Sequence, residues 1–167
     1  MAEARRVAIL GVGHRLRRDD AAGPEVCDRM RADLGLHPGV LVVDGGPAPE
    51  NCIGLLRAFH PDLVVVIDAA QMGAEPGTVR WLSLAEAGRC GASTHTLPLP
   101  TFCRLIQGSL GCEVIIMGIE PGDTSFGEGL TPPVEAAVRS LTRGGLAALA
   151  AHRPEFGHVG GEEERAV

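Results

Sequence analysis

The sequence predicts an α/β fold, a three-layer α/β/α sandwich with a single twisted, mostly parallel sheet. Apolar strand-like runs alternate with helix-like segments along the chain, which is the pattern of a parallel sheet between layers of helices. The strand-like runs are apolar at nearly every position, as in strands that helices cover on both faces. The length of 167 residues suits one domain. We therefore expect a single domain over residues 1–152 and a flexible tail over residues 153–167.

Five segments have the composition of strands. Four are short apolar runs, three of which end at glycine or aspartate. The fifth alternates polar and apolar residues from Thr78 to Trp81, which predicts an edge strand with one solvated face. The expected strands cover residues 7–13, 40–43, 63–67, 77–82 and 113–119.

Four segments have helical spacing of their apolar residues. The first is expected to begin between Asp19 and Pro24, because acidic residues and proline favour helix N-termini. Its apolar positions Val26, Met30 and Leu34 then follow four residues apart. The other expected helices cover residues 49–59, 98–110 and 133–151.

Composition excludes several classes of protein. The formal net charge is −6 and the chain has only four Phe, one Trp and no Tyr, which argues against nucleic-acid binding. The first six residues lack the features of a secretory signal, and no stretch reaches the roughly 18–20 apolar residues of a membrane helix. We therefore expect a cytoplasmic protein. The cysteines form no CxxC pair and are interpreted as small core residues, namely Cys27, Cys52, Cys90, Cys103 and Cys112.

Acidic side chains follow three of the predicted strands. Asp20 comes after the first strand, Asp44 ends the second, and Asp68 directly follows the buried third. A carboxylate at the position of Asp68 is costly unless it is paired, protonated or bound to a cation. A polar loop before the third helix adds His95, and ligands of open parallel sheets bind at the carboxyl ends of the strands.

Asp20, Asp68 and His95 together offer two oxygens and one nitrogen to a divalent transition metal. Structural roles for the same residues remain open. Asp20 and His95 can cap helices, Asp44 can hold a Gly-Gly turn, and Asp68 can accept hydrogen bonds from loop amides.

The first loop allows two other interpretations. Gly11-Val12-Gly13 with Asp44 imitates a dinucleotide-binding fingerprint, but Leu16 stands where the third glycine belongs. The arginines of residues 15–18 can grip phosphate or an acidic peptide, or they can form a self-paired surface turn with Asp19 and Asp20.

Five motifs in order resemble one family. Their order and spacing are similar to those of the hydrogenase maturation endopeptidases over roughly residues 7–140, and the stretch from Asp44 to Asn51 is most similar to the subgroup that serves the hydrogenase 3 type of large subunit. The motifs are Gly11 to His14 with Asp19-Asp20, Asp44 to Asn51, Ile67 to Gly73 with Pro76-Gly77, Ser93 to Leu99, and Met117 to Pro121.

The resemblance implies a phosphorylase/hydrolase-like α/β sandwich, generally a monomer, and an endopeptidase of aspartic type. Its substrate would be the precursor of a [NiFe]-hydrogenase large subunit, cut near its carboxyl terminus after nickel insertion. The nickel is supplied by that substrate, and other divalent metals can occupy the site. The alternative is a non-catalytic nickel-sensing chaperone of the immature large subunit.

The resemblance also assigns roles to individual residues. Asp20, Asp68 and His95 match the family's nickel-binding positions, and Asp44 matches a position implicated in activity. We expect these four residues to form the catalytic site. Two departures concern the first loop, because His14 stands where the family usually has Asn and the arginines of residues 15–18 replace a more apolar run.

Overall fold

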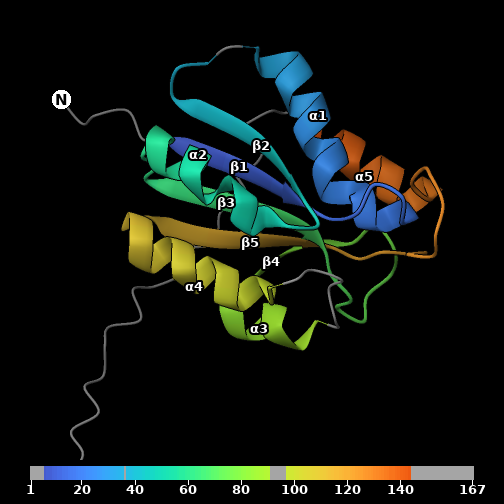
Figure 1. Ribbon diagram of the computed structural model, residues 1–167. Coiled ribbons are helices and arrows are strands. Elements are labelled where there is room, and N and C mark those ends of the chain that lie inside the picture. Colours follow the sequence, from blue (N-terminus) through green and yellow to red (C-terminus); the bar gives the residue numbers. More distant parts are fainter. Residues whose placement is uncertain (1–5, 36, 91–96, 144–167) are drawn as a thin grey trace, which may run out of the picture.

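The computed structural model describes residues 6–35, 37–90 and 97–143. Within these ranges five strands form one sheet in the order β2-β1-β3-β5-β4 (Figure 1). Strands β1, β2, β3 and β5 run parallel, and β4 pairs antiparallel with β5 at one edge. The mostly parallel sheet and its alternating edge strand are thereby confirmed. The strands are β1 (Val7–Val12), β2 (Val40–Gly46), β3 (Leu63–Ala69), β4 (Val79–Leu82) and β5 (Glu113–Ile119).

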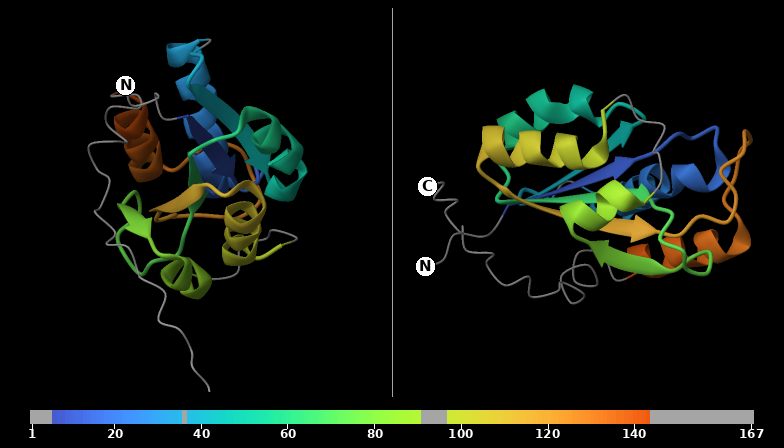
Figure 2. Two further views of the ribbon diagram at one scale, coloured as in Figure 1. Left: turned by 90° about the vertical axis from the view of Figure 1, so that its left-hand side faces the viewer. Right: turned by 90° about the horizontal axis from the view of Figure 1, so that it is seen from below.

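Helices cover both faces of the sheet, as the sandwich prediction requires. On one side lie α1 and α5, and on the other lie α2 and α4 (Figure 2). The short helix α3 packs with α4 against the same core cluster. The helices are α1 (Ala22–Leu34), α2 (Ile53–Phe59), α3 (Leu84–Arg89), α4 (Leu99–Leu110) and α5 (Pro132–Arg143).

The burial of both faces of the sheet explains why the strand sequences are apolar throughout. Along β1, Ala8 and Leu10 belong to the core cluster under α2 and α4, whereas Ile9 belongs to the cluster under α1 and α5. Successive side chains of a strand point to opposite faces, so a strand buried on both faces needs an apolar residue at every position. Phe102 of α4 fills the first cluster and is fully buried.

Helix α1 packs unusually closely on the carboxyl ends of the strands. A Cβ atom on Gly23 would lie 2.3 Å from the carbonyl oxygen of Ile67, and a Cβ on Gly11 would lie 2.4 Å from the carbonyl oxygen of Gly23. Only glycine fits at such a distance. The absence of both side chains therefore sets the start of α1 directly against β1 and the end of β3.

Helix α3 was not expected from the sequence. Its N-cap is Ser83, whose Oγ accepts a hydrogen bond from the backbone N–H of Glu86 at 3.2 Å, while the N–H of Ser83 donates to the Glu86 carboxylate at 2.8 Å. The hydrogen bond from the backbone N–H of Ser83 lowers the pKa of the Glu86 carboxyl group. The Ser-x-x-Glu spacing is a capping-box signal that the sequence does contain.

Several boundaries also differ from the expectations. The second predicted helix begins as a 3₁₀ turn over Pro49–Cys52, and α2 proper starts at Ile53. Helix α5 is described as far as Arg143, so the end of the predicted 133–151 helix and the predicted tail lie outside the described residues. No described helix has both the length and the apolar character needed to cross a membrane.

The cysteines are free thiols. Cys27, Cys103 and Cys112 are buried, as expected of small core residues, whereas Cys52 and Cys90 are half-buried. Burial raises the pKa of the Cys27 and Cys103 thiols to about 12. These two side chains are therefore neutral packing residues at neutral pH.

Candidate functional site

The candidate site lies at the carboxyl ends of three neighbouring parallel strands, β2, β1 and β3. Asp44 pairs in register with Gly11 of β1, and Asp68 of β3 pairs with Gly118 of β5. Loops and helix N-termini converge at this edge (Figure 1). The sheet thus brings Asp20, Asp44 and Asp68 to one edge, as the sequence predicted.

Asp20 is held by the loop that follows β1. Gly13 adopts a positive φ of 145°, and a Cβ at this position would lie 1.7 Å from the backbone oxygen of Asp20, so the loop can fold back only because residue 13 is glycine. The backbone N–H of His14 then donates to Asp20 Oδ2 at 2.9 Å. Asp20 is 9% exposed, and no described residue donates a hydrogen bond to its Oδ1.

Asp19 has a different task, which the sequence analysis missed. Its fully buried carboxylate accepts four hydrogen bonds from the loop that follows β5. Oδ2 accepts from Gly122 N at 2.8 Å, Asp123 N at 3.0 Å and Thr131 Oγ1 at 2.8 Å, and Oδ1 accepts from Thr131 N at 2.7 Å. Asp19 therefore fastens the β1 loop to residues 121–131. The partners lie more than 100 positions away along the chain, so no local pattern marks this role.

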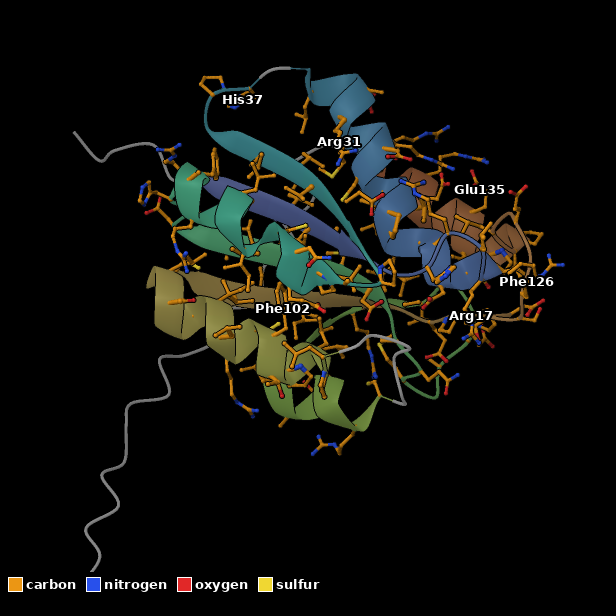
Figure 3. All side chains as sticks on the ribbon, viewed as in Figure 1. Arg17, Arg31, His37, Phe102, Phe126 and Glu135 are labelled. Atoms are coloured by element: carbon orange, nitrogen blue, oxygen red, sulfur yellow. The ribbon has the colours of Figure 1, made fainter. Side chains whose placement is uncertain are left out.

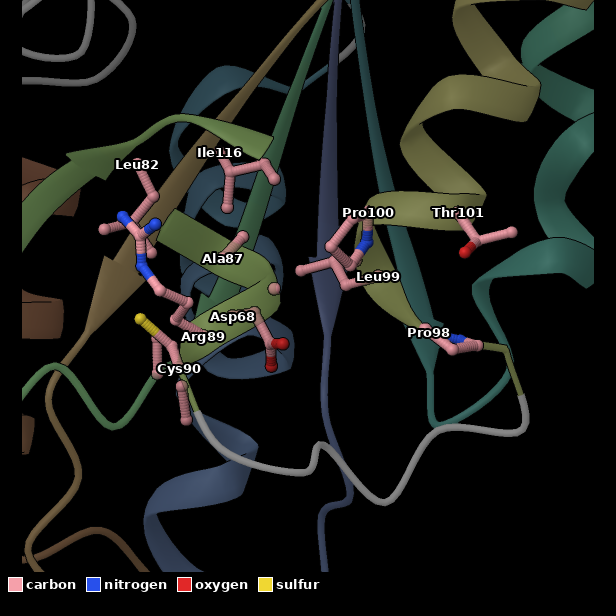
Figure 4. Close-up of a pocket in the computed structure, with 13 residues that line it drawn as sticks. Asp68, Leu82, Ala87, Arg89, Cys90, Pro98, Leu99, Pro100, Thr101 and Ile116 are labelled. Carbon is pink, nitrogen blue, oxygen red and sulfur yellow. The ribbon is translucent and has the colours of Figure 1, made fainter. Parts of the chain in front are cut away.

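Asp68 ends the buried part of β3 and is 4% exposed. It lines a pocket of about 440 Å³ between α3 and α4 (Figure 4). The walls of this pocket are mainly apolar, and its other polar side chains are Arg89, Cys90 and Thr101. Burial raises the pKa of Cys90, so its thiol is a poor nucleophile at neutral pH. The apolar wall residues are Ala69, Ala70, Leu82, Ala87, Pro98, Leu99, Pro100 and Ile116.

Asp44 is fixed by an ion pair with Arg15. Its Oδ2 accepts from Arg15 Nη2 at 2.7 Å and from Nε at 3.1 Å, and its Oδ1 accepts from Gly46 N at 2.9 Å. Arg15 Nη2 also lies 2.8 Å from Asp28 of α1. The hydrogen bond to Asp44 raises the pKa of Arg15, which keeps the guanidinium charged. Asp44 thus both holds its Gly-Gly turn and carries a cationic partner.

The arginines of the first loop are largely satisfied within the protein. Arg15 pairs with Asp44 and Asp28, and Arg18 Nε lies 3.3 Å from Asp123. Both arginines are therefore paired within the protein, but their partners lie in other segments, so the self-paired turn with Asp19 and Asp20 does not form. The Gly-x-Gly of the weighed dinucleotide fingerprint has a packing explanation, in the contacts of Gly11 with α1 and of Gly13 with Asp20.

Glu120 is a second buried acid with a structural role that was not expected from the sequence. It follows β5, is 7% exposed, and accepts hydrogen bonds on Oε2 from Met72 N at 2.6 Å and Ala74 N at 3.3 Å. Its side chain fastens the loop that follows β3. The signal available in the sequence was a charged residue directly after an apolar strand, the same signal that singled out Asp68.

The proposed metal ligands are brought together only in part. Asp20 and Asp68 lie at the same edge, because Asp20 belongs to the 3₁₀ turn Arg18–Ala21 that leads into α1, and Gly23 of α1 packs on Ile67. His95 lies outside the described residues. Among the residues that the structure describes, no group of three or more His, Cys, Asp or Glu side chains is arranged to hold a metal ion. The three-ligand set therefore stays a prediction.

Comparisons with known proteins point to one family. A family model described as "HycI: Hydrogenase maturation protease" matches residues 24–147. The hydrogenase 3 maturation protease of Escherichia coli K12 is 33% identical over 134 residues, which cover 80% of this chain and 84% of that protein. Among solved structures, the [NiFe] hydrogenase maturation protease HycI from Thermococcus kodakarensis superposes with a TM-score of 0.76 at 32% identity, covering 89% of this chain and 93% of that one. The endopeptidase HycI from Escherichia coli gives a TM-score of 0.73 at 31% identity, with coverages of 83% and 87%.

Proposed function

Because this chain belongs to the hydrogenase maturation protease family, we propose that it is the endopeptidase that removes the C-terminal extension of a [NiFe]-hydrogenase large-subunit precursor once nickel has been inserted. The observation that carries the proposal is the convergence of Asp20, Asp44 and Asp68 at one edge of the sheet beside an apolar pocket. Carboxylates at such an edge provide both metal ligands and general bases.

Recognition of the loaded precursor is assigned to Asp20, Asp68 and His95. Carboxylate oxygens and an imidazole nitrogen suit a divalent transition metal, and these three side chains would complete the coordination of a nickel ion that the precursor's cysteines already hold. The support for Asp20 is that its Oδ1 accepts no hydrogen bond from any described residue, so this oxygen can bind a metal. Such recognition links binding energy to the loading state of the substrate, so that an empty precursor is not cut.

The cut itself is assigned to carboxylate chemistry of aspartic type. Asp44, held in place by Arg15 and by the N–H of Gly46, would take a proton from the water that attacks the scissile carbonyl and return it to the amine nitrogen as the C–N bond breaks. The bound nickel would polarise that carbonyl. The chain contains no HExxH sequence, the zinc-peptidase signature.

The pocket beside Asp68 suits an extended peptide. Its buried lining residues Leu82, Leu99 and Ile116 offer apolar surface next to the carboxylate that faces the nickel in this proposal (Figure 4). An apolar side chain of the precursor tail would gain burial there while the backbone passes Asp68. This contact would hold the scissile bond close to the carboxylates.

The test is cleavage of purified precursor in nickel-loaded and nickel-free forms, with the released tail identified by mass spectrometry. We expect release only from the loaded form. Asp68→Asn and His95→Ala should abolish release, because each removes a metal ligand, while thermal unfolding remains cooperative. Normal processing by either variant contradicts the ligand assignment. Stable binding of the loaded precursor without tail release would instead identify a nickel-sensing chaperone.

A further inference from the structure

Two exposed apolar side chains, Leu16 and Phe126, lie where the loops after β1 and β5 meet. Gly127 N donates to the carbonyl of Leu16 at 2.8 Å and Arg18 N donates to the carbonyl of Gly127 at 3.0 Å, so the two loop segments run side by side. Phe126 is 79% exposed and Leu16 is 41% exposed. Figure 3 shows Phe126 at the end of the molecule toward which the parallel strands point, on the same side as Arg17.

The exposure of Phe126 is a property of a fixed loop. The four hydrogen bonds of the buried Asp19 carboxylate hold residues 121–131, and Arg17 Nε donates to the carbonyl of Thr124 at 3.1 Å. A loop tied at so many points cannot fold its aromatic ring back onto the protein. An aromatic ring kept in water in this way is typical of a surface that becomes buried in a complex.

Arg17 places a positive charge beside this apolar pair, and the exposed Glu128 lies two residues after Phe126. Arg15 and Arg18 form ion pairs within the protein, whereas Arg17 forms none with any described acid. A face complementary to Leu16, Arg17 and Phe126 therefore combines an apolar recess with a carboxylate opposite Arg17.

Resting on the proposed function, we propose that Leu16, Arg17 and Phe126 form a docking surface for the folded body of the large-subunit precursor. The surface belongs to the same loop that carries Asp20, three residues after Arg17. Leu16 and Phe126 therefore border the site on the side of Asp20, where the body of a partner that delivers its tail to the site can contact them. Exposed aromatic residues and arginines contribute more than other residue types to the stability of such interfaces.

The experiment measures the dissociation constant of the nickel-loaded precursor for wild-type protein and variants. Phe126→Ala should raise the dissociation constant about 10- to 30-fold, the size typical of losing an aromatic interface residue. Arg17→Met should weaken the salt dependence of association. The matched control is Leu105→Ala on α4, since Leu105 is 47% exposed yet lies outside this surface, and it should bind as wild type does.

Three results would overturn the proposal. One is wild-type affinity for Phe126→Ala in a protein whose thermal unfolding is unchanged, and another is equal weakening by Leu105→Ala. The third is a wild-type dimer in light scattering that Phe126→Ala converts to a monomer, because a second copy of the chain would then occupy the surface.

Failure of this proposal and failure of the proposed function give different results. If the wild-type protein binds the precursor through Phe126 but releases no tail, the docking surface is supported and the endopeptidase function is contradicted. If the protein cuts the precursor and Phe126→Ala binds it normally, the endopeptidase function is supported and the docking surface is contradicted.

Discussion

Neighbouring acids of the same type have separate tasks in this protein. Asp19 is fully buried and joins two loops, whereas the carboxylate of Asp20 accepts one hydrogen bond, from the backbone N–H of His14 in its own loop. Burial alone does not separate the two, because Asp20 is itself only 9% exposed. The number of hydrogen bonds that each carboxylate accepts does separate them: Asp19 accepts four, whereas Asp20 accepts one and its Oδ1 accepts none from the described residues.

The first prediction concerns this pair. Asp19→Asn should lower the free energy of unfolding by about 2–3 kcal/mol, because a neutral amide replaces the acceptor of four hydrogen bonds and leaves buried donors unsatisfied. Asp20→Asn should cost less than about 1 kcal/mol, because it accepts a single backbone hydrogen bond. Urea unfolding of both variants checks this, and equal losses would contradict the division of roles.

The sequence predicted the positions of three acids at the strand ends better than it predicted the contacts that hold the surrounding loops. Asp20, Asp44 and Asp68 were found from the sequence because strand ends converge in a parallel sheet, a rule that needs no knowledge of distant contacts. The tasks of Asp19 and Glu120 depend on loops more than 40 residues away along the chain. A sequence shows such contacts only after the fold has brought the loops together.

At the scale of single elements, backbone packing decides the position of the candidate site. Helix α1 starts against the ends of β1 and β3 because Gly11 and Gly23 have no side chains. Apolar runs in the sequence predicted the positions of the strands. They did not predict the close approach of α1 to β1 and β3, because a glycine in a sequence does not reveal which backbone it faces. Helix α3 was missed for another reason: its Ser83 and Glu86 capping signal was overlooked.

The second prediction concerns this packing. Gly23→Ala should destabilise the protein by about 1–3 kcal/mol, because its Cβ would overlap the Ile67 carbonyl and push α1 away from the sheet. The control is Gly54→Ala in α2, where no atom lies within 4 Å of the new Cβ. Alanine there should stabilise by about 0.5–1 kcal/mol through helix propensity. Thermal and urea unfolding measure both changes, and a stabilising Gly23→Ala would refute the packing argument.

At the scale of the whole molecule, the two helices on one face of the sheet are joined by charge as well as by apolar contact. Arg29 of α1 donates to Glu135 of α5 at 2.7 Å, across 106 positions of the chain. The hydrogen bond from Arg29 holds the pKa of Glu135 below its ordinary value. A carboxylate whose pKa is lowered by folding stabilises the folded state above its ordinary pKa, and this contribution is lost as the pH falls through the folded-state value.

The third prediction follows from the lowered pKa of Glu135. Glu135→Gln should lower the free energy of unfolding at pH 7 by about 0.5 kcal/mol, a small value because the pair is partly exposed to solvent. The difference from wild type should disappear in acid, where the wild-type carboxyl group is protonated as well. Glu75→Gln, at an exposed carboxylate with no ion pair among the described residues, is the control and should leave the free energy of unfolding at pH 7 unchanged. A loss that persists unchanged in acid would mean that Glu135 acts through packing alone.

The paired loops at the site edge have a consequence for the entropy of binding. Asp19 ties the loop after β1 to the loop after β5, and Glu120, at the start of the latter, ties the loop after β3. These three loops are consequently ordered when the chain folds. A substrate that binds across them need not immobilise them itself, so a larger share of its contact energy is available for aligning the bond to be cut.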